Sequence, residues 1–127
     1  MSHVTIVAEA AQGFEGQPVQ ARLLVRAAAA AGTDYVKFQL VYADELAVPT
    51  YQYYGLFRTL GMSEAAWESV ADEAQQRSIA LAFDVNCPRS LALALRLNAT
   101  ALKLHSTDFF NDALVDAVFD SGLEIWF

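Results

Sequence analysis

Short runs of aliphatic and β-branched residues alternate with helix-like segments along the sequence. The runs cover residues 4–9, 35–41, 79–85, 101–106 and 123–127, and the helix-like segments cover 18–32, 64–77, 88–97 and 111–120. Pro18 suits the first turn of a helix, Gly32 suits a C-terminal stop, and Ser63 suits an N-cap. Strict alternation is typical of parallel strands joined by right-handed crossover helices. The sequence therefore predicts an α/β fold of (βα)4β type with its helices on the outer side of the sheet.

Such a parallel sheet is either an open doubly wound sheet or part of a (β/α)8 barrel. A closed eight-unit barrel typically needs about 250 residues, whereas the sequence has 127. The segment after the first strand, Gly13-Phe14-Glu15-Gly16, lacks the spacing of a dinucleotide fingerprint, and no Walker sequence occurs. Nucleotide binding is therefore not predicted. Between the second strand and the helix at 64–77 we expect a loop through Asp44, Glu45 and Pro49, followed by a tyrosine-rich segment.

The composition is acidic and rich in apolar residues. The formal net charge is -7 and 55% of the residues are hydrophobic. Because a negative long-range field repels polyanions, we expect neither a nucleic-acid nor a membrane partner. The single cysteine, Cys87, fits a reducing compartment. With no signal peptide and no run of about 18 apolar residues, the sequence predicts a cytoplasmic protein.

Two of the predicted strands carry a lysine in the middle of an apolar run. Lys37 lies in Tyr35-Val36-Lys37-Phe38-Gln39 and Lys103 lies in Ala101-Leu102-Lys103-Leu104. A buried ammonium costs several kcal/mol unless an anion meets it. The pair therefore predicts a shared anion site. The alternative is that Glu9 or Asp84 neutralises these lysines in structural ion pairs.

Other polar residues gather where the predicted strands end. In barrels, this is the face that carries the chemistry. Alternatives remain open for several of them, because His105 could be a hydrogen-bonded wall residue and the Ser106 hydroxyl could bond its own backbone. Tyr51, Tyr53 and Tyr54 could form a lid over this face or simply pack. The strand-end residues are Glu9, Gln39, Asp84, Asn86, His105, Ser106 and Asp108.

Several stretches resemble the N-terminal part of the sialic acid synthase family, which comprises N-acetylneuraminate synthase and its legionaminate, pseudaminate and spore-coat relatives. The first strand carries Val7-Ala8-Glu9, and the second carries Val36-Lys37-Phe38-Gln39. The block 43–49, Ala-Asp-Glu-Leu-Ala-Val-Pro, also matches, and Leu102-Lys103-Leu104-x-Ser106 resembles the Tyr-Lys-Ile-x-Ser strand of the family. The resemblance covers nearly the whole chain in order. It implies that residues 1–127 form the N-terminal half of a TIM (β/α)8 barrel.

The resemblance also implies roles for individual residues. Enzymes of this family condense phosphoenolpyruvate with a sugar derived from a hexosamine, and the two strand lysines and the following serine help to hold phosphoenolpyruvate. Lys37, Lys103 and Ser106 would be these anchors, and Glu9 would lie near the reacting centre, so that Glu9, Lys37 and Lys103 are the catalytic candidates. Gln39, Asp84 and His105 complete the expected substrate contacts.

The resemblance further implies a divalent metal, manganese or magnesium, whose histidine ligands come from later strands. We therefore expect no metal ligand in this chain, which ends at Phe127.

The sequence departs from the family pattern at three places. Asn-His-x-Gly after the first strand is replaced by Gly13-Phe14-Glu15-Gly16, which predicts the loss of a substrate contact. Ser-Thr-Pro-Phe at the end of the third strand aligns with Phe83-Asp84-Val85-Asn86, directly or after a small gap. Ser-Gly-Glu after the second lysine becomes Ser106-Thr107-Asp108, which replaces a flexible glycine and shortens the acid.

Two functions follow from these observations. The first is a phosphoenolpyruvate-dependent sugar acid synthase, in which this chain carries the lysines that bind phosphoenolpyruvate. The second is a catalytically incomplete half-barrel that binds a small anion or only a partner half. Four and a half βα units cannot close a barrel, so we expect two open sheet edges and either a homo-oligomer or association with a complementary half.

Overall fold

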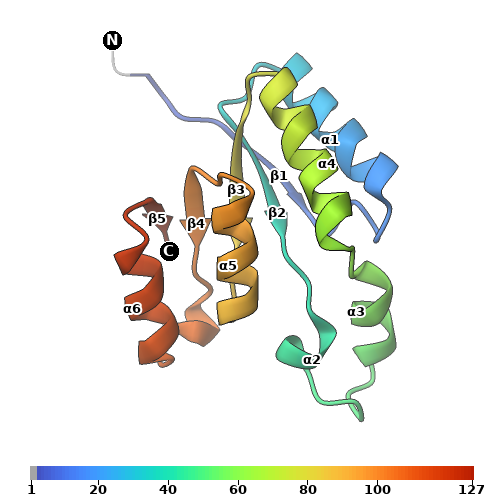
Figure 1. Cartoon of the computed structure of the whole chain (residues 1–127), viewed down its shortest axis with the longest axis vertical. Helices are drawn as coiled ribbons and strands as arrows, with labels where there is room; N and C mark the ends of the chain where they lie inside the picture. Colours follow the sequence, from blue (N-terminus) through green and yellow to red (C-terminus); the bar gives the residue numbers. More distant parts are fainter. Residues whose placement is uncertain (1–2) are drawn as a thin grey trace.

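The computed structural model describes residues 3–127, which form a five-stranded parallel sheet (Figure 1). The strands follow one another in the order β1-β2-β3-β4-β5, and every neighbouring pair is parallel. They are β1 (Val7–Ala11), β2 (Tyr35–Gln39), β3 (Ala80–Asp84), β4 (Ala101–Lys103) and β5 (Glu124–Trp126). The helices are α1 (Pro18–Ala30), α2 (Ala43–Leu46), α3 (Tyr54–Leu60), α4 (Glu64–Gln76), α5 (Pro88–Arg96) and α6 (Asp112–Asp120), with a 3-10 turn η1 (Ser106–Asp108). The predicted (βα)4β arrangement is confirmed.

Three details differ from the expectations drawn from the sequence. The first strand begins at Val7, because residues 4–6 lie ahead of the sheet. The fourth strand ends at Lys103, and the chain then enters η1 at Ser106. Residues 42–63 are not a simple loop, because they contain the short helices α2 and α3. The phenol of Tyr54 donates a hydrogen bond to the Asp44 carboxylate and so joins these two helices.

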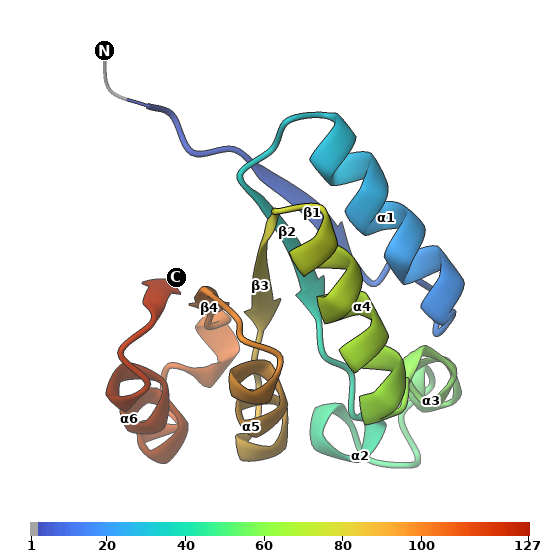
Figure 2. The same ribbon diagram turned by 45° about the horizontal axis from the view of Figure 1, so that its top comes forward.

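Each strand has one apolar face and one polar or small-residue face. The outward side chains are buried against the helices, and they include Val36, Phe38, Leu81, Phe83 and Leu102. Figure 2 shows α1 and α4 side by side over this face. Because alternate side chains of a strand point to opposite faces, the other face carries Lys37, Gln39, Asp84 and Lys103. The two strands that carry the lysines therefore have one apolar face and one polar face.

The helical layer packs on the sheet through an aromatic cluster centred on Trp67 of α4. The Trp67 ring meets three phenylalanine rings edge to face, with centroid distances of 5.1 Å to Phe14, 5.6 Å to Phe38 and 5.8 Å to Phe83. Edge-to-face pairs of this kind contribute about 0.5–1.5 kcal/mol each beyond the area they bury. The core therefore lies between the sheet and the helices, and the opposite face of the sheet is left for polar groups.

An ion-pair cluster clamps α1 to α4 beside this core. Arg26 of α1 donates two hydrogen bonds to the Glu73 carboxylate, at 2.8 and 2.9 Å, and Arg77 donates a third at 2.9 Å. These hydrogen bonds, first from Arg26 and then from Arg77, lower the pKa of Glu73 from 4.5 to about 2. A carboxyl group whose pKa is lowered by folding stabilises the fold fully at a pH above its pKa in the unfolded state. This stabilisation is lost as the pH falls through its pKa in the folded state.

We therefore expect acid to weaken the clamp between about pH 4.5 and pH 2. Urea unfolding of the wild type should show a decline in stability over this window that Glu73→Gln lacks. The exposed Glu68, five residues earlier on α4, provides the control, because Glu68→Gln should keep the wild-type pH dependence. A constant stability difference between wild type and Glu73→Gln from pH 6 to pH 2 would contradict the assignment.

Candidate functional site

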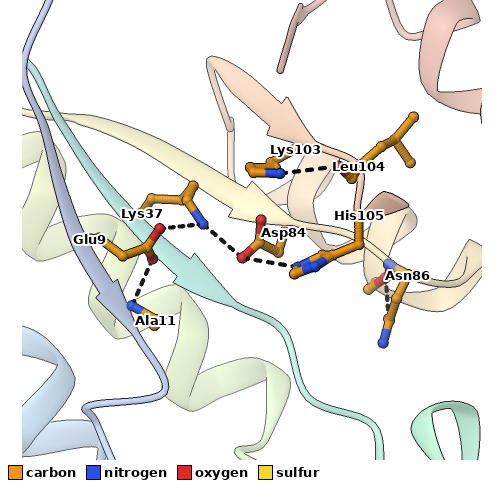
Figure 3. Close-up of polar contacts among 9 residues, drawn as sticks. Glu9, Ala11, Lys37, Asp84, Asn86, Lys103, Leu104 and His105 are labelled. Atoms are coloured by element: carbon orange, nitrogen blue, oxygen red, sulfur yellow. Dashed lines mark hydrogen bonds and ion pairs between the residues drawn. The ribbon is translucent and has the colours of Figure 1, made fainter. Parts of the chain in front are cut away.

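A chain of ionic contacts crosses the polar face of the sheet near the carboxyl ends of its strands (Figure 3). The Lys37 ammonium lies 2.7 Å from Glu9 Oε2 and 2.7 Å from Asp84 Oδ2. On the far side of Asp84, His105 Nε2 lies 3.5 Å from the same Oδ2 atom. Four of the residues singled out in the sequence, from β1, β2, β3 and the segment after β4, are thus brought together.

Strand register explains this arrangement. Glu9 pairs with Lys37 across β1 and β2, Gln39 pairs with Asp84 across β2 and β3, and Asp84 pairs with Lys103 across β3 and β4. Paired residues of parallel strands present their side chains on the same face. Lys37 and Lys103 therefore lie on one face with Asp84 between their strands (Figure 3).

A bulge at the end of β1 fixes the position of Glu9. The register between β1 and β2 shifts between Glu9 and Ala11, and Ala11 adopts a left-handed backbone with φ of 47°. This conformation directs the Ala11 N–H to Glu9 Oε1 at 3.0 Å. Bulges are common next to active sites, where they redirect a side chain. Because Oε1 of Glu9 accepts from the Ala11 N–H in this bulge, the other carboxylate oxygen, Oε2, contacts the Lys37 ammonium.

The central ion pair, between Lys37 and Asp84, is buried, so both charges need well-placed partners. Lys37 and Asp84 are only 4% and 5% exposed. Buried charges persist when they are paired and hydrogen-bonded, and Lys37 meets both of the carboxylates that the sequence suggested as structural partners. Asp84 is less completely satisfied, because its Oδ1 atom is buried and has no hydrogen-bond partner within residues 3–127.

Lys103 and Ser106 lie outside this chain of contacts. Lys103 is half-buried, and its ammonium donates to the carbonyl of Leu104 at 3.2 Å. Ser106 is exposed at the start of η1. The sequence placed Lys103 in the middle of a strand and Ser106 at its end, whereas Lys103 is the last residue of β4 and Ser106 begins η1. No contact in the described chain joins either residue to Lys37.

A cavity of about 440 Å³ opens beside Asp84 at the carboxyl ends of the strands. Five residues that the sequence analysis placed at strand ends line it, namely Gln39, Asp84, Asn86, His105 and Asp108. Gln12 and Phe57 also line it, and sequence reasoning missed both. Gln12 could have been found, because it is a polar residue directly after a strand. Phe57 gave no such signal, since it belongs to the unpredicted helix α3.

A second polar cluster occupies the same face of the sheet. Glu124 of β5 accepts hydrogen bonds from the Trp126 indole and from the Tyr35 hydroxyl of β2, each at 2.9 Å. These bonds, first from Trp126 and then from Tyr35, lower the pKa of Glu124. The same carboxylate raises the pKa of Tyr35. The cluster bridges β2 and β5 across two intervening strands.

The residues of the site do not fit a divalent metal. The Glu9 and Asp84 carboxylates both face the Lys37 ammonium, which occupies the position where a cation between them would bind. Within residues 3–127, no group of three or more histidine, cysteine, aspartate or glutamate side chains is placed to hold an ion. No helix in that range is long and apolar enough to cross a bilayer.

Parallel strands in sequential order, an apolar outer face under helices, and polar groups at the strand ends define the amino-terminal half of a TIM barrel. Residues 24–127 match the NeuB family, and the chain belongs to that family. The resemblance to sialic acid synthases drawn from the sequence is thus confirmed.

Solved structures share this fold. The N-acetylneuraminic acid synthetase of Leptospira borgpetersenii, solved in complex with citrate, superimposes with a TM-score of 0.90 at 23% identity, over 98% of this chain and 44% of that one. The spore coat polysaccharide biosynthesis protein SpsE of Bacillus subtilis gives 0.78 at 26% identity, over 98% and 35%. A DAHP synthase of Thermotoga maritima gives 0.71 at 9% identity, over 95% and 32%, which shows a shared fold alone.

The chain therefore spans less than half the length of these structural neighbours. Among curated protein sequences, none matches it significantly.

Proposed function

We propose that this chain carries the phosphoenolpyruvate-binding part of a sugar acid synthase, which condenses phosphoenolpyruvate with an N-acylated hexosamine. One observation carries the proposal. Lys37 and Lys103, the two lysines of the whole sequence, lie on the same face of the sheet on either side of β3. NeuB family membership and the sialic acid synthase neighbour support the same reaction class.

The lysines retain the hydrogen-bonding capacity that an anion needs. An ammonium has three N–H donors. Lys37 uses two of them on Glu9 and Asp84, and Lys103 uses one on the Leu104 carbonyl. Three donors therefore remain for phosphate or carboxylate oxygens, and charge-assisted hydrogen bonds of this kind are the strong ones.

The remaining residues take supporting roles in this proposal. Glu9 contacts the Lys37 ammonium and orients it, and its 52% exposed side chain can also reach a reacting group. Gln39 and His105 contact substrate from the cavity wall, and Ser106 adds a hydroxyl at the start of η1.

Selective lysine labelling tests the proposal. Because the sequence has two lysines, an amine-specific reagent can modify only Lys37, Lys103 and the N-terminal amine, and peptide mass spectrometry can resolve the three sites. We expect phosphoenolpyruvate to slow modification of both lysines and to leave the N-terminal amine unaffected. In Lys103→Gln, the protection of Lys37 should be lost, because each charge-assisted contact contributes roughly 1.5–3 kcal/mol.

Arg96→Gln provides the matched control for this experiment. It removes the same charge, but Arg96 belongs to the helical layer and pairs with Glu64 in an exposed contact. Protection should therefore persist in this variant. Equal labelling rates of Lys103 with and without phosphoenolpyruvate would place the anion elsewhere and refute the proposal.

A half-barrel that associates with a second polypeptide is the alternative function, and the open sheet edges favour it. β1 pairs only with β2, and β5 only with β4, within residues 3–127. In that case this chain would bind its anion as one component of an assembly, which is either a homo-oligomer or a complex with a complementary half. In both cases we propose a cytoplasmic location, because Cys87 is buried and unpaired, as suits a reducing compartment.

A further inference from the structure

The exposed face of α1 is apolar. Val19, Leu23, Ala27 and Ala30 lie on it, and the two larger side chains are 59% and 47% exposed, respectively. The exposed side of α4, the other long helix, carries acidic residues instead. The spacing of the four α1 residues places them in one continuous row along the helix. We refer to this row as the α1 stripe.

The α1 stripe points away from the sheet. Ala21, Val25 and Ala28 are the residues that α1 buries, and each stripe residue is two positions from one of them. Two positions correspond to about 200° around an α-helix. A further helix of the same layer would lie beside α1, as α4 does on one side (Figure 2). A helix added beside α1 by a complementary half would therefore leave the stripe uncovered.

Charge limits what can cover the stripe. The chain has a formal net charge of -7, yet α1 contains two arginines and no acidic residue. Both arginines contact α4, where Arg22 donates to Ser69 and Arg26 donates to Glu73. Neither an acidic nor a basic partner would find complementary charges along the stripe. A second copy fits better, because two acidic chains repel each other least where they carry no carboxylate.

The order of side-chain sizes suits pairing of the stripe with itself. Val19 and Leu23 come first, and the two alanines follow. In an antiparallel pair of these helices about a two-fold axis, Val19 faces Ala30 of the second copy. By the same symmetry, Leu23 faces Ala27 of the second copy. Each larger side chain then meets a methyl group, so the two helices can pack closely. A parallel pair would set leucine against leucine and leave gaps between the alanines.

We propose that the α1 stripe is a contact surface for a second copy of this chain, which packs its own α1 antiparallel to the first across a two-fold axis. This surface is separate from the free edges of β1 and β5 and from the polar face that carries the lysines. The pairing of α1 therefore does not rest on phosphoenolpyruvate binding, and either can fail without the other.

Cysteine cross-linking tests the antiparallel pairing. The native Cys87 is 3% exposed, so it should not compete. Leu23→Cys and Ala27→Cys are mixed and mildly oxidised, and the disulfide-linked dimer is measured on a non-reducing gel. We expect the mixture to form this dimer severalfold faster than either variant alone, because residue 23 of one copy faces residue 27 of the other. Val19→Cys mixed with Ala30→Cys should behave in the same way.

A charged substitution shows whether the stripe holds the two copies together. Leu23→Asp, added to both members of the Val19→Cys and Ala30→Cys mixture, should abolish the linked dimer, because it places a carboxylate in an apolar contact. Leu95→Asp is the matched control, since Leu95 is 42% exposed on α5 and its replacement adds the same charge. Cross-linking should persist with this substitution.

Three results would overturn the proposal. Faster linkage of Leu23→Cys with itself than with Ala27→Cys would show that the helices do not pair in the antiparallel arrangement. Equal rates for the matched mixture and for Val19→Cys mixed with Leu23→Cys would indicate random collision. Absence of any linked dimer, in variants whose circular dichroism matches that of the wild type, would exclude a second copy as the partner of the stripe.

Discussion

Replacing Lys37 with methionine is expected to destabilise the fold by about 3–5 kcal/mol, because it removes one partner of a buried ion pair and leaves the other charge uncompensated. Lys37 and Asp84 are almost completely buried, so water cannot readily take over the solvation of the Asp84 carboxylate. Since small domains have a total stability of about 5–15 kcal/mol, a loss of this size should lower the urea midpoint markedly. Urea unfolding monitored by circular dichroism measures it.

The other lysine is the matched control for this substitution. Lys103 is half-buried and forms no ion pair within the described chain, so Lys103→Met should cost much less. Combining Lys37→Met with Asp84→Asn should recover part of the loss, because the near-isosteric amide removes the orphaned charge. Equal effects of Lys37→Met and Lys103→Met would show that the ion pairs of Lys37 contribute nothing special to stability.

Self-association of the purified 127-residue chain is the second large effect we expect. The free edges of β1 and β5 expose unpaired backbone groups, which pair readily with another chain. An apolar patch lies beside β5, where Phe109 and Phe119 pack on Phe127 and Phe110 is 94% exposed. Exposed apolar patches of this kind mark interaction surfaces. Sedimentation velocity at micromolar concentrations should therefore show dimers or larger species.

Two charge substitutions locate the contact. Phe110→Asp together with Phe127→Asp should shift the chain toward monomer, because carboxylates cannot be buried in an apolar interface without a partner. Tyr53→Asp is the control, since Tyr53 is also exposed, at 51%, but lies just before α3, away from β5 in the sequence. A wild-type chain that sediments as a monomer and melts cooperatively would contradict this expectation.

The fold was largely predictable because local signals and the global pattern agree. Pro18, Ser63 and Asn111 mark helix starts within one residue, and the alternation of strands and helices leaves few topologies. The segment 42–63 was not predictable in this way. Its helices α2 and α3 are short, and they are held together by contacts such as that between Tyr54 and Asp44, which no periodicity reveals.

The sequence predicted which residues belong to the site, but not which of them form ion pairs with one another. The sequence singled out Glu9, Lys37 and Asp84 because they are polar residues in strands or at strand ends. It could not show that Lys37 forms ion pairs with both carboxylates and that Lys103 forms none with them. That outcome depends on register and on the bulge at Ala11, which are tertiary features. The partnerless Oδ1 of Asp84 is likewise visible only in three dimensions.

The bridge from Tyr35 to Glu124 spans the concave face of a curved sheet. The two residues are 89 positions apart and lie on β2 and β5, and the small side chains of Ala82 and Ala101 on the strands between leave room for the Tyr35 ring to meet Trp126 at 5.0 Å. Residues on non-neighbouring strands can touch in this way only if the sheet curls toward them. The curvature is thus encoded within these five strands, and any strand that adds to the free edge of β5 meets a template that is already bent.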